Sequence, residues 1–368
     1  MKTSLIALVL SCASLLASDV AEGQATDRER GASTRPVEAN SALPDSFAWT
    51  SSDLLVSPPP HPSREIISIK DPSIVRHDGA WHIYATTADA DANGNWRMVY
   101  LNFADWDQAG DARAVHLDVV NRHFTGYHCA PQVFYFEPHE KWYLIYQSQQ
   151  PQYSTTNDLS DPSSWTDGTD FFDGKPANTP DLWIDYWVVC DDTHAYLFFT
   201  GDDGKLYRSR TGIDDFPRGM GEVEVVLEDP NRFNLFEGSA HYRIKGTEQY
   251  LTIIEAIGQG GVRFYRSWIS DGLDGEFRPL ADTWENPFAG PSNVTHANPA
   301  DPWTADISHG ELLRDGKDQT MTIDPSDLKL LYQGQRPGGR GLEYSQLPYR
   351  LGLLTLTQPE AEGSNDQN

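Results

Sequence analysis

The sequence predicts an all-β protein, a five-bladed β-propeller that spans residues 45–357 of the 368-residue chain. No long stretch of this region has helical periodicity, and short apolar runs alternate with turn signals such as Asp202–Gly204, a pattern typical of antiparallel hairpins. One hairpin unit also recurs five times, at intervals of roughly 50 to 70 residues, a period typical of propeller blades. A β-sandwich would explain the strands but not this recurrence.

Each unit has a small or acidic start, an apolar strand, a polar turn and a second strand that is usually aromatic. We expect the strand pairs, in chain order, at 70–75 and 81–85, 130–135 and 142–146, 185–189 and 195–199, 237–242 and 250–254, and 308–313 and 320–323. Because the first strand of each blade lines the central channel, equivalent residues should ring the axis at one level. Those positions carry Asp71, Gln132 or its neighbours, Asp185, Glu237 and His309.

The two ends of the chain differ from this pattern. Residues 1–18 are typical of a signal peptide, with Lys2 before a short apolar run and small residues that allow cleavage there or as late as residue 25. The run is too short to span a bilayer, so we expect a secreted protein; a lipoprotein anchor at Cys12 is the weaker alternative. The polar segments 19–44 and 358–368 predict a disordered linker and a disordered tail.

Composition excludes several classes of partner. The formal net charge of −26 argues against nucleic acid and anionic membranes. A neutral polysaccharide remains compatible, and eleven Trp and sixteen Tyr would suit it, although most should pack in the core. The sequence contains no Gly-rich phosphate loop, no Cys/His zinc spacing and no Gly-x-Ser-x-Gly elbow. Beyond the leader, Cys129 and Cys190 are compatible with one disulfide or with two free thiols.

Three predicted channel residues are acidic: Asp71, Asp185 and Glu237. Carboxylates around one pocket repel one another, so Ser or Ala would serve stability better. Such clusters are typical of sites that separate an acid from a base. Taken singly, Asp71 could be a turn former before Pro72, and His309 could be structural. Together their equivalent positions indicate an active site on the axis.

These motifs resemble those of glycoside hydrolase family 62, the α-L-arabinofuranosidases. The resemblance runs in order across about residues 46–357, through Ile69–Ile74, Ala130–Phe134, Trp183–Asp185, Phe236–Gly238, Arg263 with Arg266–Trp268, Ile307–Glu311 and Leu347–Leu354. It implies a five-bladed propeller, shared with family 43, and removal of arabinofuranose side chains from plant cell-wall arabinoxylan. The sequence leaves open whether arabinan is a further substrate. The resemblance also implies a protein that needs no organic cofactor, and we expect a monomer.

The resemblance implies a role for each site residue. Asp71 matches the general base, Glu237 the general acid, and Asp185 the residue that orients the acid and modulates its pKa. His309 matches a ligand of a calcium ion whose other positions are filled by water. The residues that would surround the arabinose are Lys70, Ile184, Arg263, Gln333 and Tyr344. An inverting, single-displacement mechanism then requires carboxyl groups ~6.5–9.5 Å apart, against ~5 Å for retention.

Two other functions remain open at this stage. A family 43 β-xylosidase or arabinanase would use the same three acids, although Leu347–Leu354 and the motif around His309 favour family 62. A non-catalytic carbohydrate-binding propeller would not need the acids. For the wall of the polymer cleft we expect Tyr344, the Gln147–Gln150 loop, and the loops around three tryptophans, Trp165, Trp284 and Trp303.

Overall fold

The computed structural model describes residues 42–91, 96–336 and 341–357. The predicted signal peptide, the predicted tail and residues 19–41 of the predicted linker lie outside the described residues. Leu43, near the end of that linker, is buried in the core. Within the described ranges, no helix is both long and apolar enough to cross a membrane.

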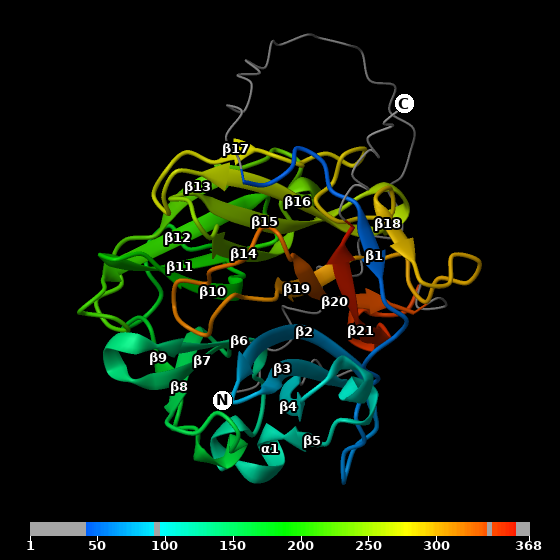
Figure 1. The fold of residues 1–368 in the computed structure, drawn as a ribbon. Coiled ribbons are helices and arrows are strands. Elements are labelled where there is room, and N and C mark those ends of the chain that lie inside the picture. The colour runs from blue at the N-terminus through cyan, green and yellow to red at the C-terminus, as the bar shows by residue number, and fades with distance from the viewer. Residues whose placement is uncertain (1–41, 92–95, 337–340, 358–368) are drawn as a thin grey trace, which may run out of the picture.

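Five β-sheets surround a central axis, with the first strand of each sheet nearest to it (Figure 1). The first four blades have four strands each. The first blade consists of β2 (Ile66–His77), β3 (Ala80–Asp89), β4 (Arg97–Phe103) and β5 (Ala114–His116), and the second of β6 (Cys129–Phe136), β7 (Lys141–Gln147), β8 (Pro151–Thr156) and β9 (Thr169–Asp170). The third consists of β10 (Ile184–Cys190), β11 (His194–Thr200), β12 (Lys205–Gly212) and β13 (Glu224–Glu228), and the fourth of β14 (Glu237–Arg243), β15 (Tyr250–Ile257), β16 (Arg263–Ser270) and β17 (Arg278–Pro279). The five-bladed propeller prediction is therefore confirmed.

Helices are short and lie in the connections. They are α1 (Leu117–Val120) and the 3-10 helices η2 (Trp106–Asp111), η3 (Arg122–Phe124), η4 (Glu137–His139), η5 (Pro162–Ser164), η6 (Arg232–Asn234), η7 (Gln259–Gly261) and η8 (Tyr344–Gln346).

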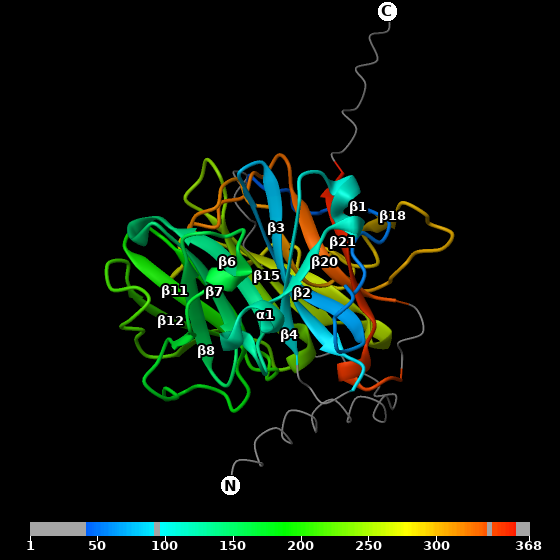
Figure 2. The same ribbon diagram turned by 90° about the horizontal axis from the view of Figure 1, so that it is seen from below.

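The fifth blade closes the ring with a strand from the other end of the domain. Its order is β18 (Val294–His296), β1 (Trp49–Ser51), β21 (Tyr349–Leu356), β20 (Lys329–Gln335) and β19 (Ser308–Leu312). β1 pairs antiparallel with β21 (Figure 2) and parallel with β18. Trp49 is buried beside this junction and donates its indole N–H to the Phe288 carbonyl. The first and last parts of the domain are thus held together by noncovalent pairing.

The predicted second strand of the fifth blade, 320–323, is wrong. β20 fills that place, and the segment 313–328 instead leaves the sheet and passes beside the first strands of other blades (Figure 1, orange). Its backbone accepts hydrogen bonds from Tyr135 and Cys190, and Ile323 donates to Arg243. Ile323 is fully buried there. This apolar residue, which suggested a strand of the fifth sheet, instead packs against the end of β14.

A β-bulge interrupts every first strand. Its left-handed residue has φ of 48° at Asp71 and at Ala130, 57° at Asp185 and 64° at Gly238, and the fifth ladder shifts register at the matching place, between Ser308 and Gly310. Bulges re-aim side chains and are common beside active sites.

The bulges correct the predicted ring of equivalent residues. The ring consists of Asp71, Ala130, Asp185, Gly238 and His309. The member from the second blade, predicted as Gln132 or its neighbours, is therefore Ala130, and the placement of Glu237 in the ring was wrong. Glu237 lies one residue earlier, level with Lys70 and Ile184. Gln132 instead joins two blades, because its amide exchanges two hydrogen bonds with the backbone of Val188.

Candidate active site

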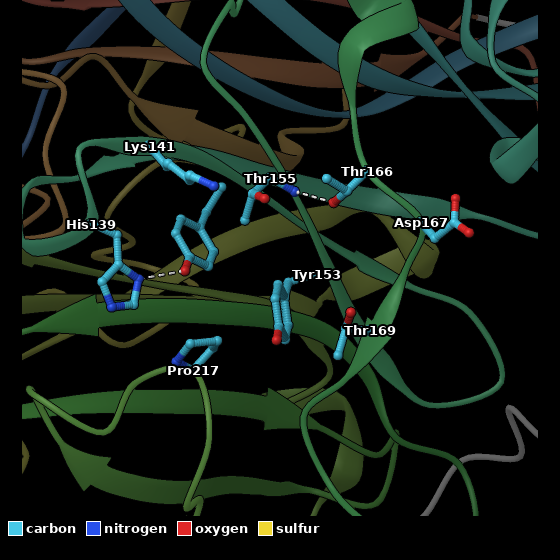
Figure 3. Close-up of a pocket in the computed structure, with 9 residues that line it drawn as sticks. His139, Lys141, Tyr153, Thr155, Thr166, Asp167, Thr169 and Pro217 are labelled. Atoms are coloured by element: carbon cyan, nitrogen blue, oxygen red, sulfur yellow. Dashed lines mark hydrogen bonds between the residues drawn. The ribbon is translucent and has the colours of Figure 1, made fainter.

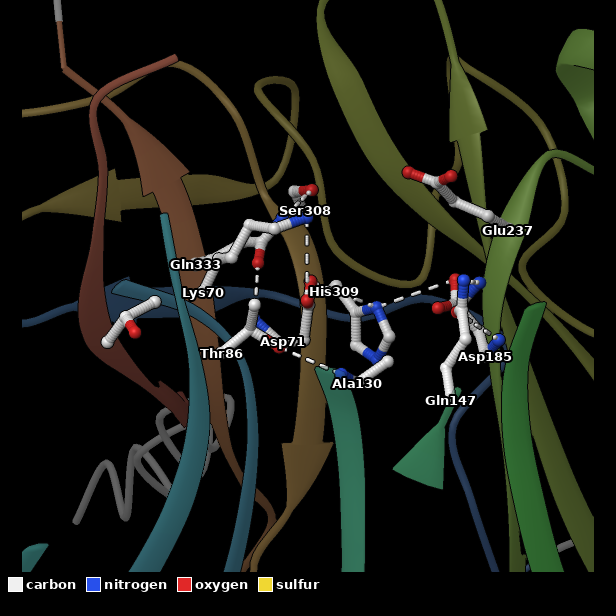
Figure 4. A network of polar contacts seen from close by, with 12 residues as sticks. Lys70, Asp71, Thr86, Ala130, Gln147, Asp185, Glu237, Ser308, His309 and Gln333 are labelled. Carbon is white, nitrogen blue, oxygen red and sulfur yellow. Dashed lines mark hydrogen bonds and ion pairs between the residues drawn. The ribbon is translucent and has the colours of Figure 1, made fainter. Parts of the chain in front are cut away.

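The bulged ends of the first strands surround a pocket of about 100 Å3 on the axis. All three predicted acids line it, and Figure 4 shows His309 between Asp71 and Asp185, with Glu237 on a neighbouring strand. His309 Nδ1 is 3.6 Å from Asp71 Oδ1 and 3.7 Å from Asp185 Oδ2. Four residues far apart in the chain therefore meet at one site.

The two aspartates have opposite electrostatic surroundings. Burial acts to raise the pKa of Asp71, but Lys70, His309 and the Thr86 hydroxyl together hold that pKa below its usual value. Lys70 Nζ is 3.4 Å from Asp71 Oδ2. Burial raises the pKa of Asp185 to about 7, with Glu237 and Asp71 adding to the increase and His309 opposing it. These opposite shifts of pKa favour ionisation of Asp71 over ionisation of Asp185.

Glu237 shares a cation with another acid. Arg263 Nη1 contacts Glu237 Oε1 and also Glu255 Oε1. Glu255 is fully buried and accepts hydrogen bonds at Oε2 from the Ser308 hydroxyl and the His309 amide, each at 2.7 Å. Burial raises the pKa of Glu255. Glu255, in the second strand of the fourth blade, therefore links Glu237, through Arg263, to Ser308 and His309 at the start of the fifth blade.

Sequence reasoning missed Glu255 and two other acidic or aromatic members of the site. Glu255 interrupts the apolar strand β15, and a lone acid in such a run was the available signal. Asp202 was assigned only to a hairpin turn, yet it lines the pocket, and its Oδ1 is buried without a hydrogen-bond partner. Burial, Glu237 and Asp185 raise the pKa of Asp202. Trp96 also lines the pocket, with Lys70 Nζ 4.6 Å from its ring centre.

Four of the five predicted sugar-contacting residues line the pocket: Lys70, Ile184, Arg263 and Tyr344. Lys70 Nζ donates to the Tyr344 hydroxyl at 3.2 Å, which orders both side chains. Gln333 lies behind the pocket wall. It accepts from the Asp71 amide at 2.6 Å and donates to the Ser308 hydroxyl, so its contacts position Asp71.

The three tryptophans predicted for the cleft wall do not line the pocket. Trp165 is buried and donates to the Tyr84 hydroxyl, and Trp303 donates to the Ser52 carbonyl. Trp284 packs edge-on against Phe264. Their rings fill space between neighbouring segments.

Of the Gln147–Gln150 segment, the pocket lining includes Gln147, the last residue of β7. Its side-chain amide donates to the Tyr127 hydroxyl. Cys129 also lines the pocket, and it and Cys190 are buried free thiols, which decides against the disulfide alternative.

A larger, more open hollow lies over the second blade (Figure 3). Asp167 is the one acid among the residues that line it, and it lies across the hollow from His139 (Figure 3). Acid–base cleavage of a glycosidic bond requires a pair of carboxyl groups. The axial pocket is therefore the candidate active site.

His309 could supply only one of the ligands of a calcium ion, and oxygen donors would have to supply the others. Calcium takes six to eight oxygen ligands, whereas His309 offers one nitrogen. In the described part of the chain, His309 and the two aspartates do not form a group of three mutually close donor atoms; His61, His116 and Asp118 do.

A five-bladed propeller with buried, electrostatically distinct carboxyl groups in an axial pocket defines the glycoside hydrolase class of site. The chain belongs to glycosyl hydrolase family 62, whose model matches residues 48–355. It is 44% identical over 312 residues to alpha-L-arabinofuranosidase C of Cellvibrio japonicus, covering 84% of this chain. The chain spans about half, 47%, of the length of that relative.

Solved structures give the same family. The catalytic domain of the Coprinopsis cinerea family 62 α-L-arabinofuranosidase is 46% identical with a TM-score of 0.81, covering 86% of this chain and 98% of that one. A family 62 hydrolase in complex with xylotriose is 45% identical with a TM-score of 0.79, covering 84% and 98%. A thermostable family 43 hydrolase shares the fold alone, at 14% identity, a TM-score of 0.54 and coverage of 83% and 96%.

Proposed function

We propose that this protein is an α-L-arabinofuranosidase that removes arabinofuranose side chains from xylan-type polysaccharide, and arabinoxylan in particular. The observation that carries the proposal is the meeting of Asp71, Asp185 and Glu237 in one small axial pocket. Family membership, the activity named for the relatives and the xylotriose complex support it. Secretion and a monomeric state remain predictions from the sequence.

Each acid has a distinct task in the proposed reaction. Glu237 protonates the glycosidic oxygen that leaves with the xylose. Asp71, kept ionised by Lys70, takes a proton from the water that attacks the opposite face of the anomeric carbon. Asp185 accepts a hydrogen bond from the Gly238 amide at 3.0 Å, so it orients the backbone next to Glu237.

Arg263 explains how Glu237 could change its protonation state in a buried site. Because Arg263 also contacts Glu255, its charge stays compensated when Glu237 gains a proton. An unpaired buried guanidinium would otherwise oppose that step.

Incubation with arabinoxylan, followed by NMR of the released sugar, tests substrate and mechanism together. Single displacement at an α-linked arabinofuranoside should release arabinose first as the β anomer. The α anomer as first product would contradict inversion. Xylose release from a nitrophenyl xyloside, or cleavage of linear arabinan in preference to arabinoxylan, would favour the family 43 activities. Sugar binding without arabinose release would favour a binding propeller.

We also propose a calcium ion held by His309 with water ligands. The support is electrostatic, since His309 faces two carboxylates that would favour a cation. Such an ion would offset the negative charge of Asp71 and Asp185 in the pocket. We expect a calcium-selective chelator to lower the melting temperature of the wild type, and added calcium to restore it, with no response in His309→Ala. Equal responses in both proteins would contradict this assignment.

A further inference from the structure

A second cluster of ligand-type side chains lies at the outer edge of the first blade, where the sequence showed no motif. His61 lies in the segment that leads to β2, His116 ends the outermost strand β5, and Asp118 lies in α1. The side chains of His61 and Asp118 are 2% and 7% exposed, and His116 is also buried. One donor atom from each residue lies within 4.8 Å of those from the other two.

Each of the three side chains has one buried polar atom without a hydrogen-bond partner. His61 Nε2, His116 Nδ1 and Asp118 Oδ1 are each buried and unpartnered. The nearest His61–Asp118 approach, Nε2 to Oδ2, is 3.7 Å, too long for a hydrogen bond. Buried polar atoms normally find partners, and each exception requires an explanation such as an ion. Three such atoms from three segments point to one ligand.

The outer nitrogen of His116 is engaged in a way that suits metal binding, whereas that of His61 must first exchange its partner. His116 Nε2 lies 3.0 Å from the Pro60 carbonyl, which can only accept, so the proton is on Nε2 and Nδ1 keeps its lone pair. His61 Nδ1 accepts a hydrogen bond from the Ser63 amide at 3.1 Å and lies 3.3 Å from the Ser63 hydroxyl. Zinc binding through Nε2 would move the ring proton to Nδ1, where the hydroxyl can accept it, and would break the bond from the amide. Such outer contacts orient metal-binding histidines.

Two arginines balance the acids around the cluster. Arg64 donates to Asp118 Oδ2 at 2.9 Å and pairs with Asp89, and Arg97 pairs with Asp89 and lies 3.7 Å from Asp118 Oδ2. These guanidinium groups oppose a cation. They engage the Oδ2 atom of Asp118, however, and leave Oδ1 available as a single ligand.

We propose that His61, His116 and Asp118 bind one Zn2+ ion. Two imidazole nitrogens and one carboxylate oxygen form a donor set that zinc accepts readily, with water in the fourth position, whereas calcium and magnesium prefer oxygen ligands. The site is separate from the axial pocket, whose lining residues include none of the three.

The position of the site gives it a structural role. After β1 leaves the fifth blade, the chain bridges from Val56 to Leu351 of β21 and then passes His61 on its way to β2. Zinc would tie this connection to β5, which has only three residues and pairs with β4 alone. It would thus reinforce the place where the ring closes.

Zinc titration of the full-length, metal-stripped protein by calorimetry tests the site. We expect one tightly bound Zn2+ per chain, no equivalent binding of Mg2+, and a melting temperature raised by about 4 °C at zinc concentrations about 100 times Kd. Co2+ in place of zinc should give the visible absorption of a four-coordinate site.

His61→Gln and His116→Gln should each weaken zinc binding more than about 100-fold. Losing a contact outside the ligand set weakens metal binding by at most about 100-fold, and the loss of a ligand should exceed this. Glutamine at 116 can still donate to the Pro60 carbonyl, so this variant removes the ligand while preserving the fold. His194→Ala, in the third blade, is the matched histidine control and should bind zinc as the wild type does. Wild-type affinity in both glutamine variants, or no zinc binding by the wild type, would overturn the proposal. If His116→Gln fails to fold, His61→Gln, in the connection, decides.

Discussion

Replacing Glu237 by glutamine should lower turnover on arabinoxylan at least ~10²-fold without unfolding the protein. Glutamine has nearly the same shape but cannot donate the proton that the leaving xylose oxygen needs. Arg263 keeps Glu255 as its partner in this variant, so no buried charge is left unpaired. Steady-state kinetics, with circular dichroism and a melting curve as the test of folding, measure this effect.

A change of leaving group separates the acid from the base. A nitrophenolate leaves without protonation, so Glu237→Gln should lose much less turnover on a nitrophenyl arabinofuranoside than on arabinoxylan. Asp71→Asn should lose at least ~10²-fold on both substrates, because each requires an activated water. Glu248→Gln, an exposed glutamate paired with Arg243, is the control. Equal losses on both substrates in Glu237→Gln would remove the acid assignment.

The strand starts could be predicted because they combine a repeated motif with a strong apolar pattern. The fifth blade shows the limit of that method. Residues 320–323 have strand character, but Ile323 forms its bridge with Ile244 of the fourth blade. The local sequence indicates that a segment is extended. Which strand it pairs with depends on how all five blades are arranged.

The level of each residue on the axis could not be predicted either. Each bulge adds residues opposite one partner, and a period-2 pattern does not reveal where. For this reason the predicted position of Glu237 along the axis was wrong by one residue, although its presence in the pocket was predicted correctly. The left-handed backbone at Asp71 and Asp185 is tolerated because Asp adopts it more readily than most residues.

Residues that act through distant partners gave no signal in the sequence. The importance of Glu255 comes from its contacts with Arg263, Ser308 and His309, which belong to two other strands. His61 and His116 are separated by most of a blade, so no spacing rule connects them.

Glu255→Gln should destabilise the protein by up to about 3–5 kcal/mol, because Arg263 loses its fully buried carboxylate partner and keeps only Glu237. Glutamine can still accept hydrogen bonds from Ser308 and the His309 amide, so the loss reports mainly on Arg263. Turnover should fall as well, because Arg263 loses one of the two carboxylates that hold it beside Glu237 in the pocket. Urea unfolding and steady-state kinetics measure the two effects. Asp271→Asn, in an exposed pair with Arg278, should cost no more than about 1 kcal/mol.

A double variant distinguishes the buried charge from the catalytic role. In Glu255→Gln/Arg263→Met the guanidinium that had lost one of its two carboxylate partners is gone, so stability should recover in part relative to Glu255→Gln. Turnover should not recover, because Arg263 lines the pocket and Glu237 would have lost its only ion-pair partner among the described residues. Recovery of both would mean that Glu255 only compensates a charge. A Glu255→Gln protein as stable as Asp271→Asn would mean that Arg263 is already satisfied by Glu237.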